Sequence, residues 1–242
     1  MPLQLPEISD ESVKTLTDDI NSKGFGFLVD YISPAELEQM RSFVSSAVRS
    51  SGGQYVGFTG RDAVAGSALD EFSNSPVFRD LFRRIYERGT GRAAPKVEFY
   101  QVLRCLTGQS GKKHSLNFHF DSYVVTALIP VEIPTEGPSG DLIMLPNARK
   151  IRNTYTANVV DKILLDNKLT QVTLKLLTKM RLLPLTRIRM TPGNIYFFWG
   201  YRSIHTNEAC DPSKVRATAL FHYANPHAGS QLSLKMRGPT KH

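Results

Sequence analysis

Cysteine is scarce in this chain of 242 residues, since Cys105 and Cys210 are the only two. Two cysteines are too few for a disulfide scaffold, so we expect a reducing compartment, the cytoplasm. The first residues lack the basic and then apolar pattern of a secretory signal. No apolar run approaches the roughly 20 residues that a spanning helix needs. We therefore expect a soluble protein, with any membrane contact confined to its surface.

Acidic residues are also few, since 22 Asp and Glu stand against 30 Lys and Arg, for a net charge of +8. The excess is local: residues 149–189 hold ten basic side chains and two acidic ones. The basic ones are Arg149, Lys150, Arg152, Lys162, Lys168, Lys175, Lys179, Arg181, Arg187 and Arg189.

An amphipathic pattern lies inside this basic segment. Its apolar residues repeat at helical spacing: Leu169, Val172, Leu176, Met180 and Leu183. Three interpretations stay open: a helix for a membrane surface or a partner, a helix lying on the body of the protein with its lysines in water, or a lid that attracts an anionic substrate. A nucleic-acid site is not expected, because no run of exposed aromatic residues accompanies the charge.

The sequence His119-Phe120-Asp121 carries the main chemical signal. Side chains two residues apart on an extended segment point to the same side, so His119 and Asp121 can share a site. His205 follows the apolar run 195–198 and is the candidate third ligand at the end of a strand. Two histidines and one carboxylate on one face of a metal are the ligand set of non-haem Fe(II) oxygenases.

Two further residues complete an ordered pattern, since Arg216 lies eleven residues after His205 and Thr218 two residues beyond it. The full set resembles the Fe(II)/2-oxoglutarate-dependent dioxygenase superfamily over residues 95–225. The Gly-Phe and Ser-Pro-x-Glu-Leu sequences near residues 24–37 are loosely similar to the phytanoyl-CoA hydroxylase branch. The resemblance implies that His119, Asp121 and His205 bind iron and that Arg216 and Thr218 hold the distal carboxylate of 2-oxoglutarate.

The same resemblance implies an enzyme that uses O2 and 2-oxoglutarate and releases succinate and CO2. Its expected reaction is hydroxylation of an unactivated C–H bond in a small, anionic or polar metabolite, with desaturation, epoxidation and ring closure left open. Asn207 and Gln101 are further candidate cosubstrate contacts, and Tyr100 and Arg104 are alternatives to Gln101. Two other functions stay open: the same chemistry on a lipid or lipid-linked sugar at a membrane, and a cupin-like metal-binding protein that oxidises nothing.

The expected fold is one α+β domain over residues 1–242. Residues 95–147 and 190–226 would form a double-stranded β-helix, or jelly roll, because short strands alternate with turn signals. Residues 1–94 would support it with helices beginning near Asp10, Pro34 and Pro76, the last ending at Gly89. Residues 148–189 would be a basic helical insert.

Several other side chains have positions worth predicting. The loop before the jelly roll offers Tyr55, Phe58 and Arg61 as substrate contacts or as plain packing residues. Trp199 is expected to form a wall of the site, and His222 to lie inside the barrel on the face of Arg216. The remaining histidines, His114, His227 and His242, are expected in solvent.

Overall fold

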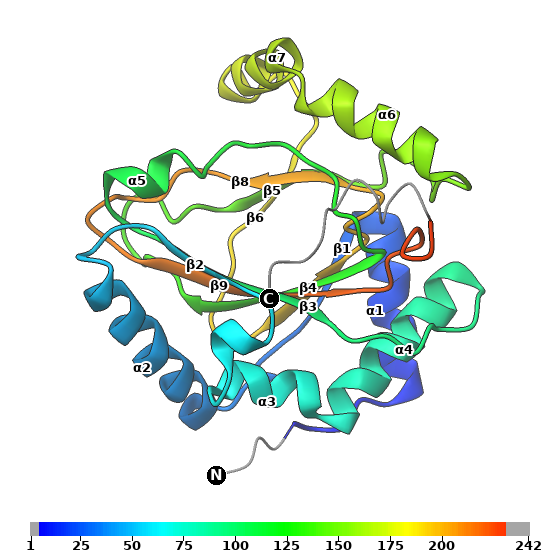
Figure 1. Ribbon diagram of the computed structural model, residues 1–242, viewed down its shortest axis with the longest axis horizontal. Coiled ribbons are helices and arrows are strands. Elements are labelled where there is room, and N and C mark those ends of the chain that lie inside the picture. The colour runs from blue at the N-terminus through cyan, green and yellow to red at the C-terminus, as the bar shows by residue number, and fades with distance from the viewer. Residues whose placement is uncertain (1–4, 231–242) are drawn as a thin grey trace.

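The structure is a computed structural model that describes residues 5–230. Two antiparallel sheets lie face to face, with helices on the outer side of each (Figure 1). The larger sheet has the order β1-β7-β4-β9-β3-β2 and the smaller β6-β5-β8, which is a jelly-roll arrangement. The strands are β1 (Phe25–Leu28), β2 (Val56–Thr59), β3 (Tyr100–Leu106), β4 (Val125–Glu132), β5 (Leu142–Leu145), β6 (Thr186–Ile188), β7 (Ile195–Phe198), β8 (Ile204–Asn207) and β9 (Arg216–Tyr223).

The helices have capping residues that explain their bounds. They are α1 (Asp10–Lys23), α2 (Pro34–Ser50), the 3-10 turn η1 (Asp62–Val64), α3 (Ala68–Asn74), α4 (Pro76–Thr90), α5 (Gly108–Lys112), α6 (Tyr155–Asp166) and α7 (Lys168–Lys179). The Ser9 hydroxyl caps α1, and Ser33 with Glu36 forms a capping box on α2. The expected starts of α1, α2 and α4 are confirmed, whereas η1, α3 and α5 were not predicted.

Helices α1 to α4 cover the outer face of the larger sheet (Figure 1). Phe78 and Phe82 of α4 meet the sheet edge-on, with ring centroids 5.1 Å from Phe221 and 4.7 Å from Phe99 respectively. Both α4 side chains are fully buried. Burial of a ring of this size contributes about 2 kcal/mol, so these contacts hold α4 against the larger sheet.

Helix α4 does not end at Gly89, as expected, but at Thr90, where Gly91 takes the left-handed conformation with φ 66°. Gly89 has a different role. A Cβ on Gly89 would lie 2.1 Å from Cη2 of the buried Trp199. The glycine is therefore required by close packing rather than by the end of the helix.

Replacing Gly89 with alanine is therefore expected to destabilise the protein, although alanine is the better helix former. The added methyl group must displace the Trp199 ring, and overpacking of this kind costs about 1–3 kcal/mol. Thermal denaturation should show a Tm lowered by about 2–12 °C, at about 2–4 °C for each kcal/mol in a chain of this size. The control is Arg88→Ala on the exposed side of the same helix. Equal Tm values for Gly89→Ala and wild type would contradict the packing argument.

Helices α6 and α7 lie on the outer side of the smaller sheet (Figure 1). The expected insert is less helical than predicted, because β6 falls inside residues 148–189 and pairs with β5. Arg149 anchors α6: its guanidinium bonds Asn158 and Asp161 and lies 3.8 Å over the Phe120 ring. In the described part of the chain, no helix combines the length and apolar character that crossing a bilayer requires.

The apolar stripe of α7 does not face the core. The contacts inward come from Leu174, which packs beside Phe118, and from Gln171, which bonds the Phe118 backbone in both directions. The helix therefore lies on the jelly roll, as one of the three interpretations expected, but its contacts come from Leu174 and Gln171 and not from the apolar stripe. Eight large apolar side chains on and just after α6 and α7 are more than half exposed: Val160, Ile163, Leu164, Leu169, Val172, Leu176, Met180 and Leu182.

Candidate metal centre

The three predicted metal ligands come from two segments that the backbone holds together. His119 lies before β4 and forms an isolated bridge to His205 of β8, with reciprocal N–H to carbonyl bonds of 3.1 Å. The Asp121 amide donates to the carbonyl of Gly200 at 3.0 Å. Residues 117–121 are not part of a regular strand. The extended backbone nevertheless places His119 and Asp121 on one side, as period two predicts.

The ligand atoms of His119, Asp121 and His205 all lie within 4.8 Å of one another. Asp121 Oδ1 is 3.8 Å from His119 Nε2 and 3.5 Å from His205 Nε2. His119 Nδ1 contacts the Asn117 carbonyl at 2.8 Å, and His205 Nδ1 contacts the Ser203 carbonyl at 3.1 Å. A carbonyl only accepts, so Nδ1 carries the proton and Nε2 is free to bind a metal.

The charges of the site suit a divalent cation. Burial and the neighbouring His205 lower the pKa of His119 to about 4, so this imidazole is neutral at pH 7. Burial raises the pKa of Asp121, but His205 and His222 outweigh it and hold that pKa well below its usual range. Burial alone would lower the pKa of His205, but the neighbouring Asp121 carboxylate has the larger effect and raises it.

The second oxygen of Asp121 is held by Thr126, a residue that was not among the predicted site residues. The Thr126 hydroxyl donates to Asp121 Oδ2 at 2.5 Å and lies 3.0 Å from His222 Nδ1. The expected place of His222 inside the barrel is thus confirmed. Thr126 is the one polar residue among the apolar residues 124–129, and a polar side chain in a buried strand needs a partner. That signal was available in the sequence.

Replacing Thr126 with valine is expected to weaken Fe(II) affinity about 10–100-fold, the usual effect of losing a hydrogen bond behind a metal ligand. Valine has the same shape but cannot orient Asp121. Isothermal titration of Fe(II) under argon measures the change, and Thr126→Ser, which keeps the hydroxyl, should bind like wild type. Equal affinities for the valine and serine variants would show that Thr126 does not position Asp121.

Arg216 and Thr218 lie on the face of β9 that is turned toward the smaller sheet. Arg216 is 2% exposed. Its Nε donates to the Gly140 carbonyl at 2.7 Å and its Nη1 to the Thr218 hydroxyl at 3.3 Å. Burial and then Arg104 lower the pKa of Arg216 to about 10. Among the residues described, no carboxylate bonds this guanidinium, so the site suits an anionic ligand.

The other two predicted cosubstrate contacts have different outcomes. Asn207 is buried and pairs with the inward-facing Leu142, which places it on the same side of β8 as His205. Gln101 pairs with Phe221, on the side of β3 that faces the helices. The prediction for Gln101 is therefore wrong, because the face of β3 that it shares with Leu103 and Cys105 is the face that the helices cover. Arg104, opposite Thr218, points to the site and donates to the His114 carbonyl at 3.1 Å.

The remaining predictions concern aromatic residues and histidines. Trp199 is not a wall of the site, because it lies in the core under the helices, and Phe198 instead packs 4.8 Å from the His205 ring. His227 is not in solvent but buried, with Nε2 2.9 Å from the Tyr201 hydroxyl. His114 is half-buried and stacks on Tyr55 at 3.7 Å. His242 lies outside the described residues.

The three candidate residues in the loop before the jelly roll also have different outcomes. Phe58 packs against Phe43 at 5.5 Å, and Arg61 pairs with Asp70 at 2.9 Å, so both have the plain structural role that was left open for them. Only Tyr55 lies near the site, through its stack on His114 and the bond from Arg104 to that residue.

No family model matches the sequence, and no curated protein sequence matches it either. Solved structures, in contrast, do match the chain. A prolyl hydroxylase from Trichoplax adhaerens, in complex with a peptide fragment of the hypoxia inducible factor oxygen degradation domain, has a TM-score of 0.59 and 12% identity over 90% of this chain and 90% of that one. The non-haem α-ketoglutarate-dependent epimerase SnoN of nogalamycin biosynthesis has a TM-score of 0.55 and 14% identity over 90% and 84%.

A third similar structure is an oxidoreductase of the 2-oxoglutarate/Fe(II) oxygenase family from Burkholderia pseudomallei, with a TM-score of 0.51 and 9% identity over 92% of this chain and 93% of that one. At these identities the likeness shows the fold. The chain therefore has the fold of the 2-oxoglutarate/Fe(II) oxygenases, which confirms the expected α+β class with a double-stranded β-helix core.

Proposed function

We propose that this protein is an Fe(II)- and 2-oxoglutarate-dependent oxygenase. The observation that carries the proposal is the convergence of His119, Asp121 and His205 within 4.8 Å, on the fold of that enzyme class. The residues fit the metal, because two free Nε2 atoms and one ionised carboxylate form the facial set of non-haem iron sites. Bound iron, with 2-oxoglutarate and O2, supplies the oxidising power for C–H hydroxylation, with succinate and CO2 as the other products.

The chain's own residues have separable roles in this reaction. His119, Asp121 and His205 would hold iron, and Thr126 would orient Asp121. Arg216 and Thr218 would bind the distal carboxylate of 2-oxoglutarate, since a planar guanidinium forms two parallel bonds with a carboxylate. Asn207 donates to the Ser115 hydroxyl at 3.3 Å and would contact the cosubstrate from β8.

The proposed substrate is a small anionic or polar metabolite. Arg104 supports an anionic group, because it adds a second cation on the face of Arg216. An aromatic stack borders the same side: Tyr123 lies 5.4 Å from both the Tyr100 and the His222 rings. Flat apolar faces beside a cation suit a compact substrate with one charged end. Membership in the phytanoyl-CoA hydroxylase branch stays a prediction.

The test is anaerobic addition of Fe(II) and then 2-oxoglutarate to the purified apo-protein, with visible spectroscopy. A weak charge-transfer band should form in wild type and be absent from His119→Ala and Asp121→Ala. Iron binding without a band would reject the 2-oxoglutarate assignment and favour a cupin-like metal-binding protein. Failure to bind iron would reject the metal site itself.

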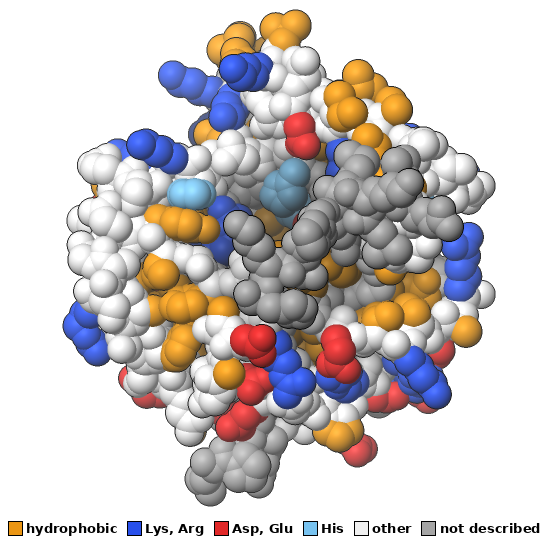
Figure 2. All heavy atoms as spheres, in the orientation of Figure 1, with side chains coloured by type: hydrophobic (Ala, Val, Ile, Leu, Met, Phe, Trp, Pro, Cys, Tyr) orange, Lys and Arg blue, Asp and Glu red, His pale blue; other side chains and the backbone are white. Residues whose placement is uncertain are grey.

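We also propose that the protein is cytoplasmic and docks on anionic membrane surfaces through α6 and α7. The free thiols Cys105 and Cys210 are both buried and suit a reducing compartment. Figure 2 shows hydrophobic and basic side chains gathered over α6 and α7. An exposed apolar stripe bordered by lysines is the arrangement that anionic lipid headgroups complement.

Sedimentation with vesicles of phosphatidylserine and phosphatidylcholine tests the docking. Wild type should sediment with these vesicles and remain in the supernatant with phosphatidylcholine alone. A variant with Ile163 and Val172 changed to serine should lose binding, since both side chains are more than 60% exposed. If wild type stays in the supernatant with both vesicles, the membrane proposal is rejected and the oxygenase proposal is unaffected.

A further inference from the structure

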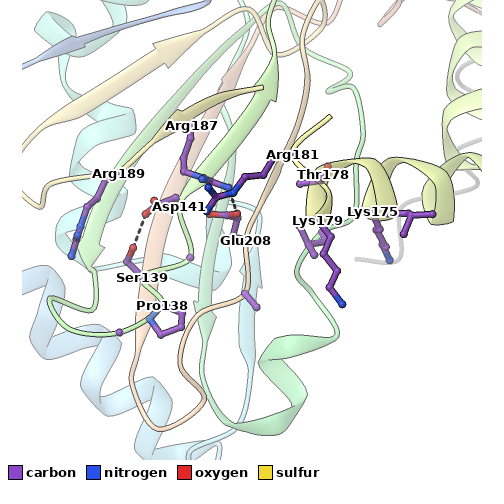
Figure 3. A pocket seen from close by; sticks show the side chains of 15 residues that line it. Pro138, Ser139, Asp141, Lys175, Thr178, Lys179, Arg181, Arg187, Arg189 and Glu208 are labelled. Atoms are coloured by element: carbon purple, nitrogen blue, oxygen red, sulfur yellow. Dashed lines mark hydrogen bonds and ion pairs between the residues drawn. The ribbon is translucent and has the colours of Figure 1, made fainter. Parts of the chain in front are cut away.

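A groove of about 780 Å³ runs between α7, the loop 137–141 and the ends of β6 and β8. Five basic side chains and two carboxylates line it: Lys175, Lys179, Arg181, Arg187, Arg189, Asp141 and Glu208. Figure 3 shows Arg181 and Arg187 extending toward Glu208, with Lys175 and Lys179 on the α7 side. The groove therefore collects charge from three segments that are far apart in sequence.

The groove is separate from the metal centre. On the smaller sheet Met144 pairs with His205, so this pair faces the barrel interior. Arg187 pairs with Ile143, which belongs to the opposite face and packs with Phe118 under α6 and α7. Side chains alternate between the two faces of a strand. Arg187 and the groove therefore lie on the outer face of the smaller sheet, whereas His205 lies on its inner face.

Much of the groove's positive charge has no partner among the described residues. Arg187 is paired with Glu208 at 2.7 Å, and Arg189 donates to the Thr135 carbonyl at 3.0 Å. Lys175, Lys179 and Arg181 make no hydrogen bond or ion pair within residues 5–230. The carboxyl end of α7 offsets only about half an elementary charge. Three cations thus face a concave surface, which concentrates their field on an anion.

A buried hydroxyl gives the second, independent indication of a ligand. Thr178 lines the groove from α7 and is 8% exposed. Its Oγ1 is buried and has no hydrogen-bond partner in the part of the chain that the structure describes. Buried polar groups normally have partners, and rotation about the Thr178 Cα–Cβ bond would turn this sealed hydroxyl toward an acceptor in the groove. Leu116 and Leu176 add an apolar wall.

We propose that this groove binds a ligand that carries phosphate groups, which Arg181 would contact at one end of the groove and Lys175 and Lys179 at the α7 end, with an apolar portion against Leu116 and Leu176. The ligand is either a free phosphorylated molecule or the headgroup of a phosphoinositide. Guanidinium and ammonium groups together favour a dianionic phosphate over a single carboxylate. This site is independent of the proposed oxygenase chemistry, because none of its side chains belongs to the metal centre.

Arg181 provides an unusually clean test. It follows the end of α7 in the left-handed conformation, with φ 57°, where glycine is preferred. Arg181→Gly therefore removes the guanidinium and relieves backbone strain together. Weaker ligand binding in this variant cannot be ascribed to misfolding if its Tm is equal to or above that of wild type.

Binding to the metal-free protein is measured calorimetrically with inorganic pyrophosphate as the soluble probe, and by sedimentation with vesicles that carry phosphatidylinositol 4,5-bisphosphate. Arg181→Gly and Lys175→Gln should weaken binding at least about tenfold, and added salt should weaken it further. Lys168→Gln, with the same charge change on the exposed start of α7, should bind like wild type. Arg216→Gln should also bind pyrophosphate normally, which separates the groove from the 2-oxoglutarate site.

Pyrophosphate binding lost in Arg181→Gly and kept in Lys168→Gln would assign a free phosphorylated ligand. The same pattern with the vesicles alone would assign a lipid headgroup. The proposal is overturned if wild type binds neither probe, or if Arg181→Gly and Lys175→Gln bind as tightly as wild type. If Lys168→Gln loses as much binding affinity as Arg181→Gly, the probe binds by unspecific charge attraction, and the groove proposal is overturned as well.

Discussion

Replacing Asp121 with asparagine is expected to lower Fe(II) affinity by more than about 100-fold and to abolish 2-oxoglutarate turnover. The substitution is nearly isosteric, and the Gly200 carbonyl keeps its bond from the backbone N–H of residue 121, but the single side-chain oxygen of asparagine cannot both accept from Thr126 and bind iron. What is lost is the only negative charge among the three ligands. A neutral amide oxygen is a poor ligand beside two imidazoles, and the site then has no charge to balance a divalent ion.

The measurements for this prediction are isothermal titration with Fe(II) and succinate formation in the presence of 2-oxoglutarate. Asp161→Asn is the matched control, since it makes the same chemical change in the carboxylate that bonds Arg149 and Arg152 outside the metal centre. The control should bind iron normally. Iron affinity in Asp121→Asn within a few-fold of wild type would show that the carboxylate is not a ligand.

Prediction from the sequence succeeded for residues whose order and spacing along the chain determine their place in the site. His119, Asp121 and His205 converge because period two places the first two together and a strand ends at the third. The positions of Arg216, Thr218 and His222 followed from alternation in one long strand, β9. These inferences need only local geometry and the chain order of a jelly roll.

Prediction was unsuccessful where both faces of a strand are apolar. Residues 195–199 are all large and hydrophobic, so alternation alone could not say that Phe198 faces His205 while Trp199 faces α4. Gln101 was misplaced for the same reason, since its neighbours on β3 gave no decisive polarity. Which face of a strand is inward depends on the helices that cover it, which are distant in sequence.

The insert shows a different limit. The spacing of Leu169, Val172 and Leu176 correctly describes one face of α7, but helical periodicity does not say what that face contacts. The core contacts come from Leu174 and Gln171 instead. Two of the ten basic residues, Arg149 and Arg152, bond Asp161 and hold α6 in place. Local net charge therefore overstated the free positive surface.

Replacing Arg216 with glutamine is expected to raise the KM for 2-oxoglutarate by about 100-fold or more. Loss of one partner from a buried, charged hydrogen-bonded pair costs about 2–5 kcal/mol. Steady-state succinate formation measures the change at saturating iron. Arg104→Gln is the control for charge, because Arg104 lies on the same face without the Gly140 and Thr218 bonds that hold Arg216. A KM unchanged in Arg216→Gln would exclude this residue as the cosubstrate anchor.

The same substitution should stabilise the protein without cosubstrate. Arg216 is buried without a carboxylate partner in the described chain, and both burial and Arg104 disfavour its charged form. Glutamine removes that cost while keeping a polar group for the Gly140 carbonyl, so the free energy of unfolding should rise by about 1 kcal/mol or more. Thermal denaturation should show Arg216→Gln melting about 2–4 °C above wild type, and wild type regaining the difference when 2-oxoglutarate and iron are added. A lower Tm for the variant in both conditions would mean that Arg216 is retained for folding rather than for an anionic ligand.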